Sequence, residues 1–238
     1  MKIALLGYGR MGKEIEKIAL SRKHEIVLKI DIDNQQDLNT TNLNKADVAI
    51  DFSVPTSAYD NIMKCFEAGT PVVSGTTGWM NKFTEVTDYC RENQKTFFYA
   101  PNYSIGVNIF FEINRLLAGM MDRFAEYDVN MEETHHIHKL DAPSGTAISL
   151  AEGILENIRR KTKWESGRTD KENLLGIESV REGEVPGVHK VRYESEVDSI
   201  EMVHTSKSRK GLAQGAVLAA EFIAGKTGIF TMKDLMSE

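Results

Sequence analysis

A glycine-rich hexapeptide near the start of the chain constrains its fold most. Gly7-Tyr8-Gly9-Arg10-Met11-Gly12 follows the apolar run Ile3–Leu6 and opens an amphipathic segment, Met11–Arg22. A GxGxxG motif between a strand and a helix is typical of dinucleotide-binding units, because its glycines permit a tight turn, close approach of the pyrophosphate and close helix–strand packing. The alternative is a glycine-rich turn that binds no ligand. We assign five residues of the motif to a cofactor: Gly7, Gly9, Arg10, Met11 and Gly12.

The first hundred residues alternate between apolar runs and helical patterns. We predict strands at 3–6, 25–30, 47–52, 71–74 and 96–100, and helices at 11–22, 56–68 and 83–92. Such alternation predicts an α/β fold, a Rossmann-like doubly wound parallel sheet with helices on both faces. Ligands of such a sheet collect beyond the carboxyl ends of its strands.

The pattern changes after residue 104. We predict a long helix at 105–124, a strand at 127–133, a helix at 146–160, several strands between 173 and 205, and a last helix at 214–224. Strands gathered in this way indicate a second, α+β domain built on an open mixed sheet. The polar segment Lys161–Asn173 predicts a mobile loop.

Composition narrows the classes of function. The net charge of −6 argues against general nucleic-acid binding. Cys65 and Cys90 have no zinc-type spacing, so we expect buried free thiols in a reducing compartment. The sequence opens directly on an expected strand without signal-peptide features, and no apolar run is long enough to cross a bilayer. We therefore expect a cytoplasmic protein without a membrane partner.

Asp31 ends the second expected strand, where dinucleotide-binding folds place an acidic residue about 20 positions beyond the glycines. Its carboxylate can accept hydrogen bonds from the adenosine ribose and would repel a 2′-phosphate, which favours NADH over NADPH. Asp33 is a weaker candidate for this role. Arg10 and Lys29 lie near enough in the sequence to leave dual specificity as the alternative.

Two later loops fall where a doubly wound sheet places its ligands. Phe52–Pro55 follows one expected strand and Ser74–Gly78 follows another. The second loop can bring backbone and hydroxyl groups close to a nicotinamide through Gly75, Thr76 and Thr77. For both loops the alternative is a structural turn, and after the first one Thr56 or Ser57 would serve as a helix cap.

The segment 134–147 combines three imidazoles, an ammonium group and an expected helix start. His135, His136 and His138 can supply a proton near neutral pH, and Lys139 can bind an anion as a compact positive charge. Ser144-Gly145-Thr146 would open the helix, whose unpaired backbone N–H groups attract an anion. The segment therefore predicts a site that binds a small anionic molecule and protonates it.

The same segment allows other interpretations. On a strand end, His136 and His138 would face one side and His135 the other, which permits different roles. His136 and His138 could instead bind a metal ion, but the ammonium of Lys139 would oppose a cation, and we predict no metal. A solvated loop with an ordinary helix cap is the remaining alternative.

These residues resemble the 4-hydroxy-tetrahydrodipicolinate reductase (dihydrodipicolinate reductase) family of bacterial lysine and diaminopimelate biosynthesis. The similarity covers nearly the whole chain and is most specific in the run from His135 to Thr146. Its other parts are Gly9–Gly12, Asp51–Ser53, Gly75–Gly78, Ala100–Asn108, Arg181–Glu184 and Ser206–Arg209. One departure follows Asp31, where the usual intervening strand and helix are trimmed.

The resemblance implies reduction of a cyclic, imine-containing dicarboxylate by NADH or NADPH. It implies that His135 is the proton donor and Lys139 the second catalytic residue. The substrate carboxylates would contact His136, Ser144, Gly145 and Thr146. The nicotinamide would lie near the loop Gly75-Thr76-Thr77 and near Ala100, Asn102 and Tyr103. Arg209 is a secondary candidate on the substrate side.

The resemblance also implies a homotetramer joined through the sheet of the second domain. We accordingly expect residues 1–104 plus 210–238 to form the dinucleotide-binding domain, and residues 105–209 the substrate-binding and oligomerisation domain. Two rival functions share the nucleotide motif: an NAD-dependent amino-acid or semialdehyde dehydrogenase, and a nicotinamide sensor without catalytic activity.

Overall fold

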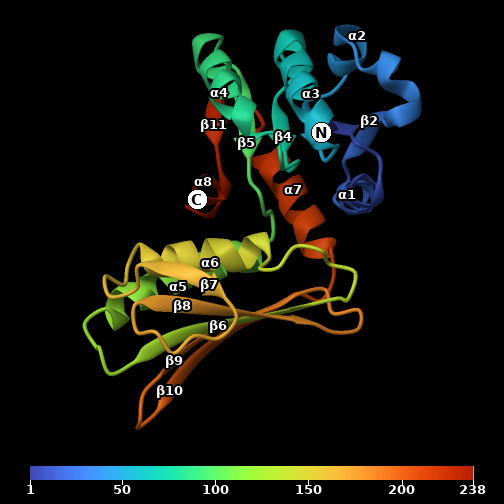
Figure 1. Cartoon of the computed structure of the whole chain (residues 1–238). Helices are drawn as coiled ribbons and strands as arrows, with labels where there is room; N and C mark the ends of the chain where they lie inside the picture. The colour runs from blue at the N-terminus through green and yellow to red at the C-terminus, as the bar shows by residue number, and fades with distance from the viewer. Residues whose placement is uncertain (238) are drawn as a thin grey trace. The chain divides into compact units, whose positions relative to one another are not determined.

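A computed structural model of the chain describes residues 1–237, which fall into two compact units (Figure 1). The first unit contains Met1–Ile105 and Arg209–Glu238, and the second contains Gly106–Ser208. These limits differ by one residue at each crossing from the domain boundaries expected above. Each unit is built on its own sheet.

The first unit contains six parallel strands in the order β11-β5-β4-β3-β1-β2. The strands are β1 (Lys2–Leu6), β2 (Glu25–Ile30), β3 (Val48–Asp51), β4 (Val72–Ser74), β5 (Thr96–Tyr99) and β11 (Gly228–Phe230). The helices are α1 (Arg10–Ser21), α2 (Thr40–Leu43), α3 (Pro55–Ala68), α4 (Phe83–Glu92), α7 (Lys210–Ile223) and α8 (Met232–Met236), with 3-10 turns η1 (Ile32–Asp37) and η2 (Met80–Lys82). The predicted doubly wound parallel sheet is confirmed.

Alternating side chains divide this sheet between two hydrophobic cores. Ile3 and Leu5 of β1 pack with α1 and α7 on one face. Ala4 and Leu6, the residues between them, pack with α3 and α4 on the other face. Because successive side chains of a strand point to opposite faces, a fully apolar strand such as β1 needs helices on both sides.

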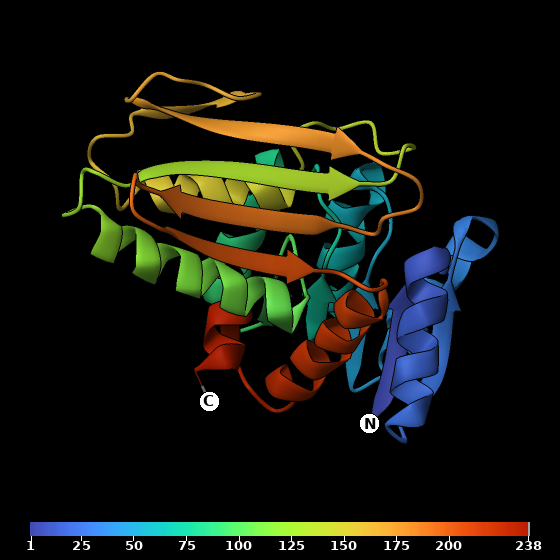
Figure 2. The ribbon, with the colours of Figure 1, turned by 90° about the horizontal axis from the view of Figure 1, so that it is seen from below.

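The second unit contains a mixed five-stranded sheet in the order β10-β9-β6-β8-β7. Its strands are β6 (Asp128–His135), β7 (Lys163–Ser166), β8 (Leu174–Arg181), β9 (Val188–Glu194) and β10 (Ser199–Thr205). The central strand β6 runs parallel to β8 and antiparallel to β9. Helices α5 (Ile105–Met121) and α6 (Gly145–Leu155) cover one face of the sheet (Figure 2). The predicted open mixed sheet is therefore also confirmed.

The expected mobile loop at 161–173 is wrong in part. Strand β7 lies within it and pairs in parallel with β8. Lys161, just before β7, is buried; its Nζ lies 2.6 Å from Asp128 Oδ1 and donates to the carbonyl of Leu174 at 2.7 Å. A short, polar edge strand shows no hydrophobic periodicity, and for this reason the sequence pattern did not reveal it.

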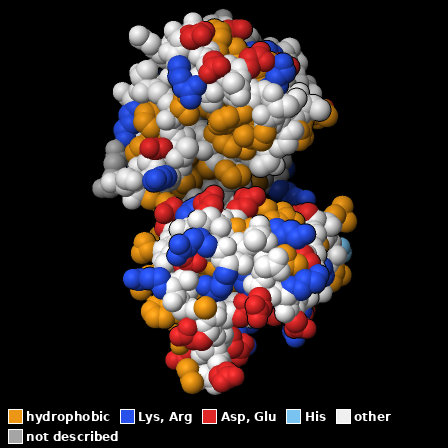
Figure 3. Space-filling model, turned by 60° about the vertical axis from the view of Figure 1, so that its left-hand side comes forward, with side chains coloured by type: hydrophobic (Ala, Val, Ile, Leu, Met, Phe, Trp, Pro, Cys, Tyr) orange, Lys and Arg blue, Asp and Glu red, His pale blue; other side chains and the backbone are white. Residues whose placement is uncertain are grey.

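The two cysteines and the charged side chains on the surface agree with what the composition predicts. Cys65 and Cys90 are free and buried, as expected, and burial raises the pKa of the Cys90 thiol to about 11. On the face shown in Figure 3, Lys and Arg side chains are interspersed with Asp and Glu on both units. Among residues 1–237, no helix is both long and apolar enough to span a lipid bilayer.

The packing of α7 gives a test of the first unit. A Cβ at Gly215 would overlap the carbonyl oxygen of Tyr103, so we expect Gly215→Ala to lower the free energy of unfolding by at least about 1–3 kcal/mol. Gly211 lies in the same helix, and the nearest atom to a Cβ there is Ser104 Oγ at 3.6 Å. Gly211→Ala should therefore be neutral or stabilising by up to about 1 kcal/mol. Urea denaturation of both variants checks this; equal effects would contradict the packing described.

Candidate functional site

The glycine motif occupies the turn from β1 to α1, and its three glycines meet different surroundings. Gly7 has φ +93°, and a Cβ there would overlap the carbonyl of Phe52. A Cβ at Gly12 would overlap the carbonyl of Gly7, whereas at Gly9 it would meet no atom within 4 Å. The first and third glycines are therefore needed for the fold, and the second leaves space in front of the backbone.

That space lies at the N-terminus of α1. Gly9 is the N-cap residue, and it has no side chain that could satisfy the first N–H groups of the helix. Arg10 is exposed and Met11 is half-buried. The strand order reverses between β1 and β3, which is the point of a doubly wound sheet where ligands bind. Unpaired N–H groups and open space suit the pyrophosphate of a dinucleotide.

A buried carboxylate joins the two loops that follow β3 and β4. Asp51 Oδ1 accepts hydrogen bonds from Ser53 Oγ (2.7 Å) and Asn61 Nδ2 (3.0 Å), and Oδ2 accepts from Ser74 Oγ (3.0 Å) and Thr76 Oγ1 (2.8 Å). The backbone N–H of Ser53 donates to Thr76 Oγ1 at 2.9 Å. Burial raises the pKa of Asp51, and these four donors oppose that rise. The sequence reasoning did not single out Asp51 as the group that joins these loops.

The other residues predicted to lie near the nicotinamide differ in their burial and contacts. Gly75 is required because a Cβ there would overlap the ring of Phe52. Thr77 is exposed, whereas Ala100 is buried. Tyr103 is 1% exposed, and its hydroxyl donates to the carbonyl of Ser74 at 2.7 Å. The Tyr103 side chain thus belongs to the core, and its carbonyl packs against Gly215 of α7.

Asn102, the remaining residue of this segment, is half-buried, and its Oδ1 accepts from the backbone N–H of Ser104 at 2.9 Å. This contact shapes the turn between β5 and α5. Residues 100–104 follow the carboxyl end of β5. Because the strands are parallel, these residues lie at the same edge of the sheet as the loops after β1, β3 and β4.

Asp31 is exposed at the end of β2, where it caps η1. Its Oδ1 accepts from the backbone N–H of Ile32 at 2.9 Å. Lys29, the nearby cation, has its Nζ 2.6 Å from Glu16 Oε1 and within 3.3 Å of the Tyr8 hydroxyl. Because Glu16 balances its charge, Lys29 is less suited to hold a 2′-phosphate.

In the second unit, the predicted histidines do not alternate along one strand. β6 ends at His135, whereas His136 and His138 lie in the turn that follows, with ring centroids 6.2 Å apart. The expectation that His135 would lie opposite the other two on a continuing strand is therefore wrong. His135 is buried and the His138 side chain is 70% exposed, so the three imidazoles have distinct surroundings.

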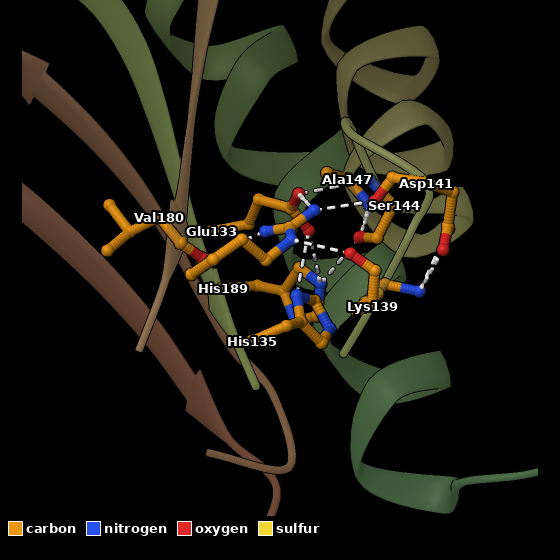
Figure 4. Close-up of polar contacts among 9 residues, drawn as sticks. Glu133, His135, Lys139, Asp141, Ser144, Ala147, Val180 and His189 are labelled. Carbon is orange, nitrogen blue, oxygen red and sulfur yellow. Dashed lines mark hydrogen bonds and ion pairs between the residues drawn. The ribbon is translucent and has the colours of Figure 1, made fainter. Parts of the chain in front are cut away.

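Glu133 is the centre of the cluster in Figure 4. It is 0% exposed, and it shares a face of β6 with His135 because every second residue of a strand points to the same face. Glu133 Oε2 lies 3.0 Å from His135 Nδ1. Oε1 accepts from Arg181 Nη2 at 3.0 Å and from the backbone N–H of Ser144 at 3.1 Å. This carboxylate therefore contacts three separate segments of the unit.

Sheet register explains why these residues meet. Glu133 pairs with Ser179 on β8 and with His189 on β9, and His135 pairs with Arg181. The His135 and His189 rings lie edge to face with centroids 5.1 Å apart. Sequence reasoning did not assign roles to Glu133, Arg181 or His189 individually. The Glu133-x-His135 spacing was the available signal, because such a pair shares one face of a strand.

Arg181 also holds the loop that carries Lys139. Its Nη2 donates to the carbonyl of Asp141 at 2.6 Å, and its Nε donates to the carbonyl of Lys139 at 3.3 Å. The Lys139 ammonium lies 2.8 Å from both carboxylate oxygens of Asp141. Arg181 thus holds the backbone at Lys139, and the Lys139 ammonium is paired with the exposed carboxylate of Asp141.

Helix α6 begins next to this cluster, where Ser144-Gly145-Thr146 predicted a helix start. Ser144 is the N-cap, and its Oγ accepts from the backbone N–H of Ala147 at 3.2 Å. Gly145 is exposed, and a Cβ there would meet no atom within 4 Å. Thr146 is half-buried. The open space at Gly145 leaves the helix N-terminus able to receive an anionic group.

The electrostatics of the cluster favour an ionised Glu133 beside a neutral His189. Burial opposes ionisation of Glu133, but hydrogen bonds from Ser144 and Arg181, with His135 and Ser179 close by, outweigh it and hold its pKa well below the ordinary range. Burial, reinforced by the charge of neighbouring His135, lowers the pKa of His189 to about 4. Near neutral pH the negative charge of Glu133 is therefore balanced mainly by Arg181.

Glu133, His135 and His189 could together offer ligands to a metal ion. One ligand atom each from Glu133, His135 and His189 lies within 4.8 Å of the others. The Arg181 guanidinium, 3.0 Å from Glu133, opposes a cation at this point. His136 and His138, the pair considered from the sequence, are not part of this group.

The neutral state of His189 makes stability depend on pH. In the unfolded chain His189 binds a proton below its ordinary pKa of about 6.5, whereas in the folded protein it binds one only below about pH 4. The free energy of unfolding therefore falls as the pH falls from about 6.5 to about 4. The loss amounts to roughly 3 kcal/mol at most. We expect His189→Gln to flatten this part of the curve, measured as the free energy of unfolding from pH 7 to 4. The exposed control His138→Gln should keep the wild-type slope; equal slopes in both variants would contradict a neutral His189.

Comparisons with known proteins cover both units. The family models "Dihydrodipicolinate reductase, N-terminus" and "Dihydrodipicolinate reductase, C-terminus" match residues 1–103 and 106–236. A 4-hydroxy-tetrahydrodipicolinate reductase of Christiangramia forsetii is 52% identical, over 100% of this chain and 98% of that protein. The enzyme of the same name from Methanosarcina mazei is 35% identical, over 98% and 88%.

A solved structure supports the fold. A dipicolinate-bound dihydrodipicolinate reductase from Paenisporosarcina sp. TG-14 superposes with a TM-score of 0.80 at 23% identity, and 97% of each chain is covered. The resemblance first drawn from the sequence motifs is confirmed by the family models and by the two relatives. The chain belongs to the dihydrodipicolinate reductase family.

Proposed function

We propose that this chain reduces 4-hydroxy-tetrahydrodipicolinate (dihydrodipicolinate) to tetrahydrodipicolinate with NADH or NADPH, in lysine and diaminopimelate biosynthesis. Its family and its 52% identity to a reductase of that name support the proposal. The structural observation that carries it is the buried pair of His135 and Glu133 beside the open helix start at Gly145. A proton donor next to an anion site is what reduction of an anionic imine requires.

The first unit would hold the cofactor. Open space at Gly9 and the uncapped start of α1 fit a pyrophosphate, and the loops tied together by Asp51 would support the nicotinamide. When bound, the reduced nicotinamide supplies a hydride. The residues proposed to contact the cofactor are Gly7, Gly9, Arg10, Met11, Gly12, Asp31, Gly75, Thr76, Thr77, Ala100, Asn102 and Tyr103.

The second unit would bind the doubly charged substrate. One carboxylate would rest on the N-terminus of α6, at Ser144, Gly145 and Thr146. His136 and Lys139 would balance the remaining charge, since both lie in the loop that leads to this helix. An ammonium paired with exposed Asp141 can exchange that partner for a ligand at little cost, because exposed ion pairs contribute about 0–1 kcal/mol.

His135 would supply the proton. Reduction of the conjugated imine leaves an enamine on the substrate, and the enamine gains a proton to give the product. The imidazolium of His135 delivers that proton and becomes neutral, with Glu133 holding the ring from behind. Lys139 would stabilise negative charge on the substrate during this step.

The direct test is steady-state oxidation of NADH and of NADPH, with the unstable substrate made in situ by the synthase reaction that precedes it. The proposal expects turnover that depends on the synthase product. Turnover with an amino acid or a semialdehyde instead would favour a related dehydrogenase. Tight NADH binding without turnover on a cyclic imine would favour a sensor.

Replacing the proton donor should affect the chemical step. We expect His135→Gln to lower kcat by about 10²–10⁴-fold, the usual contribution of a general acid, with little change in the Kd of NADH. Exposed His138→Gln serves as the matched control and should keep wild-type turnover. Full turnover in His135→Gln would remove this residue from the role.

Asp31 should set the choice of nucleotide. Its exposed carboxylate and the pairing of Lys29 with Glu16 support a preference for NADH. We expect Asp31→Ser, which keeps a helix-capping oxygen, to raise the KM for NADH several-fold and leave the KM for NADPH equal or lower. Asp33→Ser is the neighbouring control and should change neither KM. A wild-type enzyme that uses NADPH equally well would indicate dual specificity.

We further propose a homotetramer located in the cytoplasm. The expected contact is the sheet of the second unit, where Ile200 and Val203 of β10 are 40% and 50% exposed. A second apolar surface lies on α5, where four side chains spaced as one helix face are about half exposed or more: Ile109, Ile113, Leu116 and Met120. The free thiols of Cys65 and Cys90 suit a reducing compartment. Light scattering on the purified protein measures the assembly.

A further inference from the structure

We infer that Glu133 is a positioning residue, which keeps the proton of His135 on Nδ1 and leaves Nε2 as the nitrogen that exchanges a proton with the substrate. The inference rests on the proposed role of His135 as proton donor. It adds the tautomer, the working nitrogen and the residue that selects both.

The orientation of the carboxylate carries the first step. Glu133 Oε1 is occupied by Arg181 and by the N–H of Ser144, so Oε2 is the oxygen that faces His135 Nδ1, 3.0 Å away. An ionised carboxylate only accepts hydrogen bonds, and therefore it favours a hydrogen on the nitrogen nearest to it. The 3.0 Å contact is an ion-pair contact whose angle lies outside hydrogen-bond geometry, and His135 Nδ1 is wholly buried, which prevents it from reaching a ligand.

The opposite edge of the ring carries the second step. Gly187 lies beside this edge with φ +153°, and a Cβ there would approach Nε2 to 3.0 Å and Cδ2 to 3.3 Å. Glycine therefore keeps the neighbourhood of Nε2 free of a side chain. Of the two ring nitrogens of His135, Nε2 is therefore the one that lies away from Glu133 and next to a residue without a side chain.

Neutral His189 does not displace His135 from the carboxylate. Its Nε2 lies 3.9 Å from Glu133 Oε2 but 3.2 Å from Ser144 Oγ. With its pKa lowered to about 4, His189 brings no positive charge near neutral pH. Arg181 therefore remains the permanent cation beside Glu133, and His135 the nearest imidazole to Oε2.

The same carboxylate aligns the rest of the proposed substrate site. It anchors the helix start through the N–H of Ser144, and it anchors Arg181, which holds the carbonyls of Lys139 and Asp141. Glu133 thus couples the position of the proton donor to the anion-binding helix and to the loop of Lys139, without touching the substrate itself.

The wild-type protein provides the first test. In the full-length chain labelled with ¹⁵N-histidine, two-bond ¹H–¹⁵N spectra distinguish the two neutral tautomers, and the signals that disappear in His135→Gln identify His135. We expect neutral His135 to carry its hydrogen on Nδ1. A hydrogen on Nε2 in the neutral form would overturn the inference.

Variants provide the second test. Glu133→Gln keeps the shape, but its amide can donate as well as accept, so we expect a mixture of tautomers and a kcat at least about 10-fold lower, with the Kd of NADH unchanged. Glu133→Asp should retain the Nδ1–H tautomer. Glu132→Gln, on the opposite face of β6, is the control and should keep both the tautomer and the turnover. A pure Nδ1–H tautomer with full turnover in Glu133→Gln would refute the role.

These outcomes separate this inference from the proposed function. Full turnover in His135→Gln would remove the proposed proton donor, whatever tautomer is observed. Loss of turnover in that variant, together with an Nε2–H tautomer in the wild type, would overturn only the role of Glu133. If Glu133→Gln fails to fold, the wild-type spectrum still decides the question.

Discussion

A buried, ionised carboxylate is the constraint on which the second unit depends. Moving such a charge out of water costs several kcal/mol unless it is paired and hydrogen-bonded, and removing one partner of a buried pair costs about 3–5 kcal/mol. Glu133 meets this condition with His135, Arg181 and the N–H of Ser144. The energetic need to satisfy one carboxylate thus fixes a strand end, a neighbouring strand and a helix start in one arrangement.

The first unit also contains a buried carboxyl group that needs hydrogen-bond partners, at the carboxyl end of its own sheet. Asp51 is fully buried at the end of β3 and is satisfied by side chains from the loops after β3 and β4 and from α3. In both units, an acid on a strand organises groups that are remote in sequence. The proposed ligand-binding atoms lie beside these acids, on loops and helix ends whose geometry the acids hold.

Sequence reasoning succeeded where the informative residues are contiguous. Strand–helix alternation predicted the doubly wound sheet, and the run at 134–147 predicted the helix start at Ser144. The ligand sites assigned to the runs at 7–12 and 134–147 stay predictions. Sequence reasoning failed where residues meet through strand register. Arg181 and His189 lie on strands that flank β6, and their approach to Glu133 depends on pairings that one strand's sequence does not encode.

Other failures have local causes. Strand β7 is short and polar, and β11 is only three residues long, so neither gives a hydrophobic period. Tyr103, assigned to the cofactor through the family motif, stays a prediction; its side chain lies in the core, which the motif does not indicate because it identifies a position and not the environment of the side chain.

The most direct test of the central claim is a crystal structure of the protein with NAD⁺ and pyridine-2,6-dicarboxylate, a planar relative of the substrate. The account predicts one carboxylate on the N–H groups of Gly145 and Thr146, and the ring within reach of His135 Nε2 and the Lys139 ammonium. A dicarboxylate bound far from His135 and Lys139 would contradict it.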